Sequence, residues 1–389
     1  DFSNVRVIGL DSNWDYQLEV QLNWLENVLE SSCSDPNIDF IFAQLHHPHK
    51  SELWVPGETS FTGDVIDLLE QFTSNCGKPS IHFFGHTHGY SRGQSIDHAH
   101  TMVNVATAGG AIDYWGEYLQ ADYPEYSVSQ DEWGFVVLDV EAGSDPKFTL
   151  KRISRGDEDI PLDNLLKDEF TIRLHNSSPI TPNAVYPSGD IVPPNLISLW
   201  ATEFSDPDSD EHGFSQWQIS LDCSDFQSPI VDIYESHENW YFDTNTQEGN
   251  SLRNEVVTGL DGDMEYCWRV RYRDKSLKWS SWSEPSIFTT APSLYSQNLL
   301  LNPGAENDIS DWVVQEGVFE ALEEYECNGS VPHSGQYYFC VGGLCSESDY
   351  AEVYQNINVS EFYDCIDDSL ASAVFVLTEK YFQCINQAN

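Results

Sequence analysis

The sequence predicts a multidomain protein in which an α/β sandwich domain precedes two all-β sandwich domains. Before a connector at 176–194, apolar residues recur at helical spacing between short apolar runs. After the connector, apolar and polar residues alternate with a period of two. The connector is rich in Ser, Asn and Pro, a composition that keeps a chain extended and marks a boundary. We therefore expect domains at 1–175, 179–292 and 296–389.

The N-terminal domain repeats one plan, a helix followed by a buried strand. Apolar residues at helical spacing predict helices over 16–29 and around 65–72. Short apolar runs at 39–45 and 80–84 predict the strands, and a later run at 147–153 predicts an edge strand. Because helices and strands alternate, the first strands should run parallel, with their carboxyl ends at one edge of the sheet.

Histidines follow both of these strands. His46, His47 and His49 come directly after the first, and His86 and His88 follow a glycine at the end of the second. Neutral imidazoles that meet at one sheet edge are suitable ligands for Zn, Mn or Fe. A His-x-His pair also occurs in ordinary surface loops, so the pair alone leaves a structural role open.

These segments resemble the calcineurin-like metallophosphoesterases, especially the purple-acid-phosphatase-like branch. That family has a His-x-Pro motif and a later Gly-His-x-His motif, which match 46–48 and 85–88. The resemblance covers roughly the first 155 residues. It implies an α/β metallophosphoesterase sandwich and a pair of divalent or trivalent metal ions, with His46 and His86 on one metal and His88 facing the other.

The resemblance also implies roles for the remaining histidines and exposes a gap. His47 and His49 are candidates for contacting the oxygens of a phosphoester substrate. The family's earlier motifs, which supply a bridging carboxylate and a catalytic His, do not occur in order in this sequence; residues 63–67 spell one of them by chance on a helix. We therefore expect an N-terminally incomplete domain, the second half of a two-metal site, and negligible activity of the chain as given.

Charge and hydropathy exclude several partners. With Asp+Glu 64 against Lys+Arg 17, the net charge is −47, and nucleic acid and anionic membranes are repelled. No apolar run reaches the ~18 residues that a membrane span needs. The scattered carboxylates indicate a well-solvated surface.

Cysteines and glycosylation motifs favour a secreted or cell-surface protein. Two disulfides are expected, Cys33 with Cys76 near the ends of the two helices and Cys223 with Cys267 on sandwich strands. The other five cysteines are an odd number, which suggests a partner in another chain or beyond the given sequence. Asn-x-Ser motifs begin at Asn176, Asn328 and Asn358.

The second domain resembles a fibronectin type III sandwich. Alternating strands are expected at 216–220, 230–234 and 266–272, and the Trp-rich segment 279–283 should stack on Arg side chains of the last of these. An acidic loop with Asp206, Asp208 and Asp210 offers oxygen ligands for Ca²⁺, although a solvated loop is the better interpretation in so acidic a chain.

The last domain resembles the opening strands of a galactose-binding-like jelly roll, with strands apparently missing at its end. Such modules hold sugars, and Trp312 or Tyr337 would be the stacking platform, unless these rings belong to the core.

Two functions remain open after the sequence analysis. One is an extracellular metal-dependent phosphoester hydrolase of which this chain is a fragment. The other is a structural or adhesive cell-surface or filament protein that carries a degenerate phosphoesterase-like domain and assembles with other chains.

Overall fold

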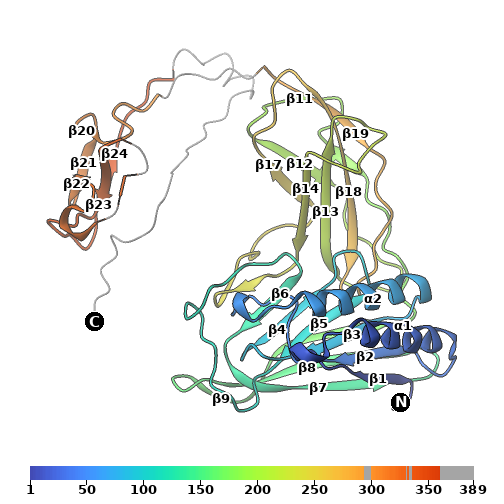
Figure 1. The fold of residues 1–389 in the computed structure, drawn as a ribbon. Helices are drawn as coiled ribbons and strands as arrows, with labels where there is room; N and C mark the ends of the chain where they lie inside the picture. Colours follow the sequence, from blue (N-terminus) through green and yellow to red (C-terminus); the bar gives the residue numbers. More distant parts are fainter. Residues whose placement is uncertain (293–298, 330, 333–334, 360–389) are drawn as a thin grey trace. The chain divides into compact units, whose positions relative to one another are not determined.

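The computed structural model describes residues 1–292, 299–329, 331–332 and 335–359 (Figure 1). The chain forms two compact units. The first unit comprises Asp1–Asp190, Ser198–Val256 and Glu265–Phe288. The second comprises Ile191–Ile197, Val257–Met264 and the described residues from Thr289 onward. Among the described residues, no helix combines the length and the apolar character that a membrane crossing requires.

The N-terminal domain is built on one large mixed sheet. Its strands are β1 (Val5–Gly9), β2 (Phe40–Gln44), β3 (Ser80–Phe84), β4 (Tyr90–Gln94), β5 (His100–Val105) and β6 (Tyr126–Gln130), extended by β15 (Trp240–Tyr241) and β16 (Thr244–Asn245). Their order is β1-β2-β3-β5-β4-β6-β15-β16. The neighbours β1, β2, β3 and β5 pair in parallel, which confirms the predicted parallel pairing of the strands that are β2 and β3, whereas β4 is antiparallel to β5 and β6.

Helices cover one face of this sheet and a second sheet covers the other. The helices are α1 (Glu19–Ser34) and α2 (Ser60–Cys76), with one-turn helices η1 (Trp14–Tyr16) and η2 (Val55–Gly57) in the loops. The second sheet contains β7 (Trp133–Glu141), β8 (Lys147–Gly156) and β9 (Pro161–Arg173). The layers confirm the predicted α/β sandwich.

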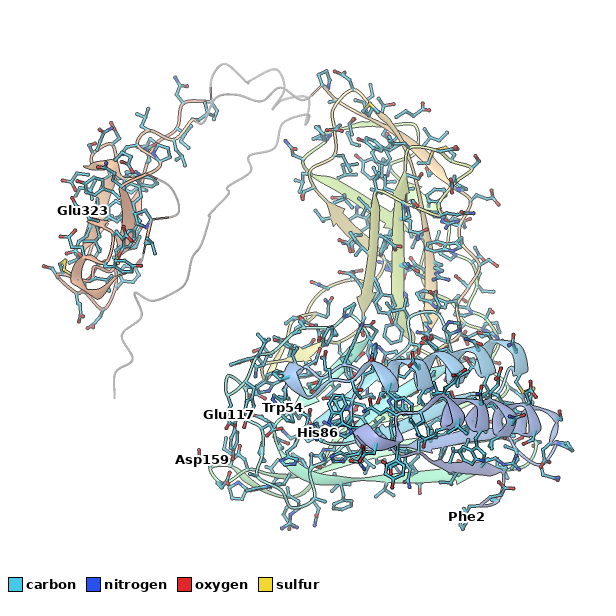
Figure 2. The ribbon with its side chains drawn as sticks, in the orientation of Figure 1. Phe2, Trp54, His86, Glu117, Asp159 and Glu323 are labelled. Carbon is cyan, nitrogen blue, oxygen red and sulfur yellow. A yellow bond between two sulfur atoms is a disulfide. The ribbon has the colours of Figure 1, made fainter. Side chains whose placement is uncertain are left out.

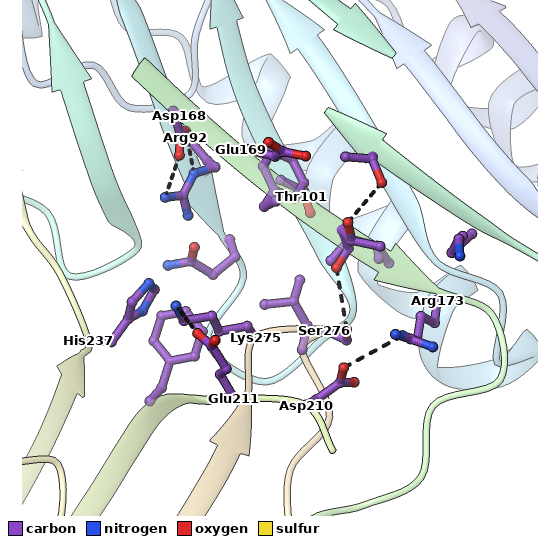
Figure 3. Close-up of a pocket in the computed structure, with 18 of the residues that line it drawn as sticks. Arg92, Thr101, Asp168, Glu169, Arg173, Asp210, Glu211, His237, Lys275 and Ser276 are labelled. Carbon is purple, nitrogen blue, oxygen red and sulfur yellow. Dashed lines mark hydrogen bonds and ion pairs between the residues drawn. The ribbon is translucent and has the colours of Figure 1, made fainter. Parts of the chain in front are cut away.

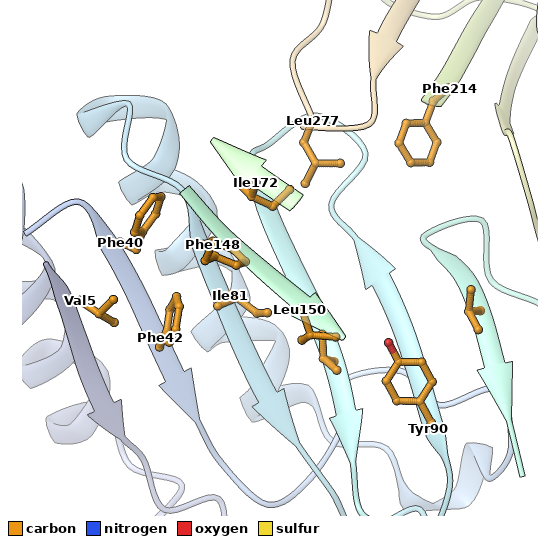
Figure 4. Close-up of a cluster of buried hydrophobic side chains, with 12 residues drawn as sticks. Val5, Phe40, Phe42, Ile81, Tyr90, Phe148, Leu150, Ile172, Phe214 and Leu277 are labelled. Atoms are coloured by element: carbon orange, nitrogen blue, oxygen red, sulfur yellow. The ribbon is translucent and has the colours of Figure 1, made fainter. Parts of the chain in front are cut away.

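The side chains of β2 point alternately into the two hydrophobic cores of the N-terminal domain. Phe40 and Phe42 pack toward the second sheet, edge to face with Phe148 at 5.2 Å (Figure 4). Ile41 points to the opposite face, where it packs with Leu25 of α1 and other helix residues. Because side chains alternate with period two, the same five residues serve two layers.

The strand at 147–153 is predicted to lie at an edge of its sheet, and this prediction is wrong. It forms β8, which lies between β7 and β9. Strand β9 could not be predicted from the sequence because most of its first half is exposed and polar residues interrupt its alternation, for example at Asp163 and Lys167.

Both expected disulfides are present. Cys33 at the end of α1 is bonded to Cys76 at the end of α2, with a Cα–Cα distance of 5.5 Å. Cys223 is bonded to Cys267 of the sandwich, with 5.2 Å between the Cα atoms.

The fibronectin-like part consists of two sheets. One contains β10 (Ala184–Tyr186), β12 (Ile197–Ala201) and β17 (Asn254–Val257). The other contains β11 (Ile191–Val192), β19 (Ser286–Thr290), β18 (Glu265–Asp274), β13 (His212–Ser220) and β14 (Val231–Ser236). The buried rings of Trp217 and Trp268 stack at 5.8 Å between centroids. The predicted sandwich architecture is confirmed. Its short strands β10 and β11 lie in the connector, because an extended chain can pair with neighbouring strands.

The predicted stacking of Trp on Arg is confirmed on β18. The Arg271 guanidinium lies 4.1 Å from the Trp279 ring and 4.6 Å from the Trp282 ring, and Arg269 lies 4.1 Å from Trp282. A third arginine of β18, Arg273, contacts the N-terminal domain within the first unit. Fully buried Arg273 donates to the carbonyl oxygens of Ser95 and His98, each at 2.7 Å.

A second buried cation joins the same two domains. The Arg92 side chain donates to both carboxylate oxygens of Asp168, at 2.7 and 3.1 Å, and to Glu238 at 2.5 Å. The Tyr90 hydroxyl donates to Asp168 at 2.7 Å. Every charged group here has a partner, which is the condition under which buried charge is tolerated.

The described C-terminal residues form two small sheets, β21 (Val313–Glu316) with β24 (Glu352–Tyr354) and β22 (Phe319–Glu323) with β23 (Tyr337–Val341). A further strand, β20 (Glu306–Ile309), and the turn η3 (Glu326–Asn328) flank them. A disulfide joins Cys327 to Cys345. The Trp312 ring packs with Phe319 and Phe339, as the core interpretation of this aromatic residue predicts.

Two buried histidines make stability depend on pH. His82 Nδ1 lies 2.9 Å from His100 Nε2, and the Ser80 hydroxyl lies 2.7 Å from His100 Nδ1. Burial lowers the pKa of His82 to about 3 and that of His100 well below its usual value. Both are neutral when folded, whereas unfolded imidazoles bind protons below about pH 6.5.

We expect the free energy of unfolding to decrease as pH falls from about 6.5 toward 3, by about 1.4 kcal/mol per pH unit for each histidine. Urea titrations at several pH values measure this slope. The double variant His82→Gln/His100→Gln keeps polar groups at both positions and should flatten it. An equal slope in the double variant would show that other groups cause the dependence.

Candidate metal centre

Three imidazoles meet at the carboxyl ends of adjacent parallel strands. His46 follows β2 and His86 follows β3, and the register pairs Gln44 with Phe83. His46 Nε2 lies 3.1 Å from His86 Nδ1, and with His47 the three side chains offer nitrogens within 4.8 Å of one another. His86 lies beside Trp54 in Figure 2. The group has the donor type and the spacing that a metal ion needs.

Ser12, in the loop after β1, holds the backbone of the first two histidines. Its Oγ accepts hydrogen bonds from the backbone N–H groups of His46 and His47, at 3.1 and 2.9 Å, and lies 2.9 Å from His47 Nδ1. With both acceptor positions used, the hydroxyl donates its own hydrogen to His47 Nδ1. The ring proton of His47 is then on Nε2, which acts as a hydrogen-bond donor. This nitrogen can bind a metal only in the tautomer that carries the proton on Nδ1.

Lowered pKa values make two rings of this group, those of His86 and His47, suited to metal binding. Burial, and then the neighbouring His47 and His46, lower the pKa of His86 to about 4. Burial and then His46 also lower the pKa of His47. Metal ligation needs the unprotonated imidazole, so neither ring has to lose a charge at neutral pH.

His86 has a left-handed backbone, with φ of +70°. A residue with a Cβ is strained in this region, and such strain persists where surrounding contacts impose it. Gly85 N–H donates to the His46 carbonyl at 2.9 Å, and Asn104 Nδ2 donates to the Thr87 carbonyl at 2.9 Å. The conformation aims the His86 ring at His46.

The structure does not bring His88 or His49 into this group. The His88 backbone N–H donates to Asp113 at 2.8 Å, and its half-exposed ring lies 3.9 Å from the other carboxylate oxygen of Asp113. His49 Nδ1 lies 3.4 Å from the Thr59 carbonyl, beside the first turns of α2. The trio of converging imidazoles is therefore His46, His47 and His86. His47, a candidate for substrate binding, is its third member, and His88 is not.

Aromatic rings flank the trio. The Trp54 ring lies 4.8 Å from the His86 ring, and exposed Tyr118 lies 5.7 Å from Trp54. The sequence analysis did not identify Ser12, Trp54 or Asp113. Only the position of Ser12 directly after an apolar strand, like that of the histidines, could have indicated it.

The acidic loop does not form a comparable cluster. Asp206 accepts the backbone N–H groups of Asp208 and Asp210, and Asp208 accepts that of Ser177 at 2.6 Å. Asp210 lies 3.6 Å from Arg173. In the part of the chain that the structure describes, no three of these carboxylates converge as the histidines do. The other convergent group, Glu326 with Cys327 and Cys345, has its sulfurs in a disulfide.

A polar cavity of about 760 Å³ lies between β9 and loops of the fibronectin-like part (Figure 3). Five basic side chains line it, Arg92, Lys147, Lys167, Arg173 and Lys275. Each forms an ion pair with a carboxylate. The carboxylates Glu141, Asp168, Glu169, Asp210, Glu211 and Glu238 also line the cavity, so charges of both signs are interspersed on its wall.

The glycosylation motifs differ in their surroundings. The Asn176 amide donates to both carboxylate oxygens of Asp274, at 3.0 and 3.1 Å, so a sugar on this nitrogen would replace one of these contacts. Asn358 is exposed. The side chain of Asn328 lies outside the described residues.

No family model and no curated protein matches this sequence. Among solved structures, the chain is similar to GAP50, the anchor in the inner membrane complex of Plasmodium, at 16% identity and a TM-score of 0.30, over 42% of this chain and 50% of that one. The chain therefore spans half the length of GAP50.

The chain is also similar to modules with fibronectin type III folds. Fibronectin(III)-like modules of Clostridium thermocellum CbhA match at 11% identity and a TM-score of 0.23, over 48% of this chain and 81% of that one. Titin module A71 from human cardiac muscle matches at 16% identity and 0.18, over 29% and 88%. At these scores the comparisons carry no argument about chemistry, and the architecture rests on the sheets described above.

The strain at His86 can be measured. Replacing His86 with Gly should leave the protein about 1 kcal/mol more stable than replacing it with Ala, because only Gly adopts a positive φ without a steric penalty. Urea denaturation of the two variants gives the difference. Equal stability would mean that the turn relaxes once the imidazole is removed.

Proposed function

We propose that the N-terminal domain is part of a metal-dependent phosphoester hydrolase, with His46 and His86 as metal ligands. The observation that supports this proposal is the meeting of imidazole rings at the carboxyl ends of adjacent parallel strands. In open α/β sheets this edge is where ligands bind.

The residues present fit Zn, Mn or Fe, since imidazole nitrogens suit these ions. Such an ion polarises a phosphoryl oxygen and lowers the pKa of a water molecule, so that hydroxide is available at neutral pH. His47, whose Nε2 carries a proton, is placed to donate a hydrogen bond to a phosphoryl oxygen. The Trp54 ring packs beside the His86 ring, and the Tyr118 ring packs against Trp54.

The described residues supply nitrogen ligands and no carboxylate to this cluster. A two-metal hydrolase needs a carboxylate that bridges the ions and a group that protonates the leaving group. We infer that these groups come from further sequence that carries the family's Asp and Asn-His motifs. His88, held by Asp113, faces the second ion in that complete site.

A second candidate function is a structural one. The buried Arg92 and Arg273 contacts join the domain firmly to the sandwich, which suits a module of a cell-surface or filament protein. In this function the histidines bind no metal, or bind one without turnover, and the protein assembles with other chains. Carbohydrate binding by the C-terminal part fits either function.

The three disulfides between described residues fit an oxidising compartment, and we propose a secreted or cell-surface location. Non-reducing mass mapping and glycopeptide analysis test this proposal. Free thiols at these positions in the natural protein would contradict it.

We expect the chain as given to bind one Zn²⁺ or Co²⁺ and to show negligible turnover of an aryl phosphate. His46→Ala and His86→Ala should each abolish binding in a calorimetric titration, because each variant removes one of the two proposed ligands. His175→Ala, which removes an exposed histidine elsewhere, is the matched control and should bind normally.

A version extended at its N-terminus with the missing motifs should hydrolyse aryl phosphate with added Zn²⁺, Mn²⁺ or Fe, and His86→Ala should remove that activity. Failure of the extended protein to bind metal and to turn over substrate would support the structural function instead.

A further inference from the structure

A hairpin of the fibronectin-like part is built into the sheet of the N-terminal domain. After β14 the chain leaves the sandwich, and β15 pairs in parallel with β6 through Trp240 and Val128. The following strand, β16, pairs with β15 at the edge of the same sheet. The last two strands of the large sheet therefore come from the second domain, within one compact unit.

The tip of this hairpin contacts the loop at 106–125. The Trp115 ring lies 4.9 Å from the Tyr241 ring and 5.4 Å from the Phe242 ring. Asn239 Nδ2 donates to the Asp122 carboxylate at 3.1 Å. Aromatic contacts of this kind are worth about 0.5–1.5 kcal/mol beyond the area they bury.

The same loop contacts the histidine turn from its other side. The Asp113 carboxylate accepts the His88 backbone N–H at 2.8 Å, and the Asp113 N–H donates to the His88 carbonyl at 3.0 Å. Leu119 accepts the Val55 N–H at 3.0 Å, next to Trp54. One residue separates Trp115 from Asp113, and one separates His88 from His86.

This loop depends on outside contacts for its order. Between β5 and β6 its 106–125 backbone forms no helix or strand. Several of its side chains are exposed, Leu119 by 67%. Ordering such a segment costs about 1–2 kcal/mol per residue in backbone entropy, so a few aromatic contacts alter its population of ordered states.

We propose that the hairpin positions the histidine site: Tyr241 and Phe242 hold Trp115, Trp115 keeps Asp113 against His88, and this pair maintains the strained turn at His86. The second domain thereby sets the metal affinity of a site to which it contributes no ligand. This inference rests on the proposed metal site. Groups that orient ligands from outside the coordination sphere typically change metal affinity by about 10–100-fold.

The test uses the whole chain and Co²⁺ alone, followed by its visible absorption. Trp115→Ala and the double variant Tyr241→Leu/Phe242→Leu should each weaken Co²⁺ binding about tenfold, and Trp115→Phe should restore most of the affinity. Trp240→Ala is the matched control. It removes a large ring from the same hairpin, and that ring donates to Glu238 instead of packing on Trp115.

Hydrogen exchange in metal-free protein is the second measurement. Amides of 85–89 and 106–113 should exchange faster in Trp115→Ala and in the double variant, and at the wild-type rate in Trp240→Ala. If Trp115→Ala does not fold, the double variant decides both measurements. Unchanged exchange and unchanged Co²⁺ affinity in the decisive variant would overturn the inference. If wild-type protein binds no Co²⁺, the proposed metal site fails, while hydrogen exchange still tests whether the hairpin positions the turn.

Discussion

Parallel pairing of β1, β2 and β3 is the constraint on which the site depends. The register sets Gly9 opposite Gln44, and Gln44 opposite Phe83. Ser12, His46 and His86 each follow within three residues of those positions, so one edge collects all three. A slip of one residue would turn Phe40 and Phe42 toward the helices and move Ile41 into the other core. The two cores thus fix the register, and the register assembles the histidines.

The layers of the fold and part of the candidate site could be predicted from the sequence. Periodicity and strand order predicted the layers, and chain position predicted that His46 and His86 would meet. The cysteine pairs followed because Cys33 and Cys76 lie at helix ends and Cys267 lies on β18, although Cys223 lies in the turn after β13 and not on the expected strand. Local pattern could also place Arg side chains of β18 against Trp279 and Trp282, since both sequences are short and regular.

What could not be predicted depends on turn conformation and on contacts between distant residues. The left-handed backbone at His86 decides where that ring points, and no residue pattern indicates a positive φ at a histidine. The third ring of the cluster is that of His47, which Ser12 contacts. It is not that of His88, whose backbone N–H is bonded to Asp113. The contact of Trp115 with Phe242 joins residues in different domains, for which sequence periodicity gives no information.

The chain's charge places a further demand on any activity at this edge. A net charge of −47 attracts cations and repels a phosphoester dianion, and salt screens both effects beyond about 8–10 Å. Long-range repulsion slows the approach of substrate, whereas the final contacts are decided by local groups. Around His46 those groups are imidazole and aromatic rings, with the carboxylates of Asp11 and Asp113 near His47 and His86. A bound cation would then be the dominant local charge, and the strongly acidic surface would favour its recruitment while leaving the anion to be attracted by the metal alone.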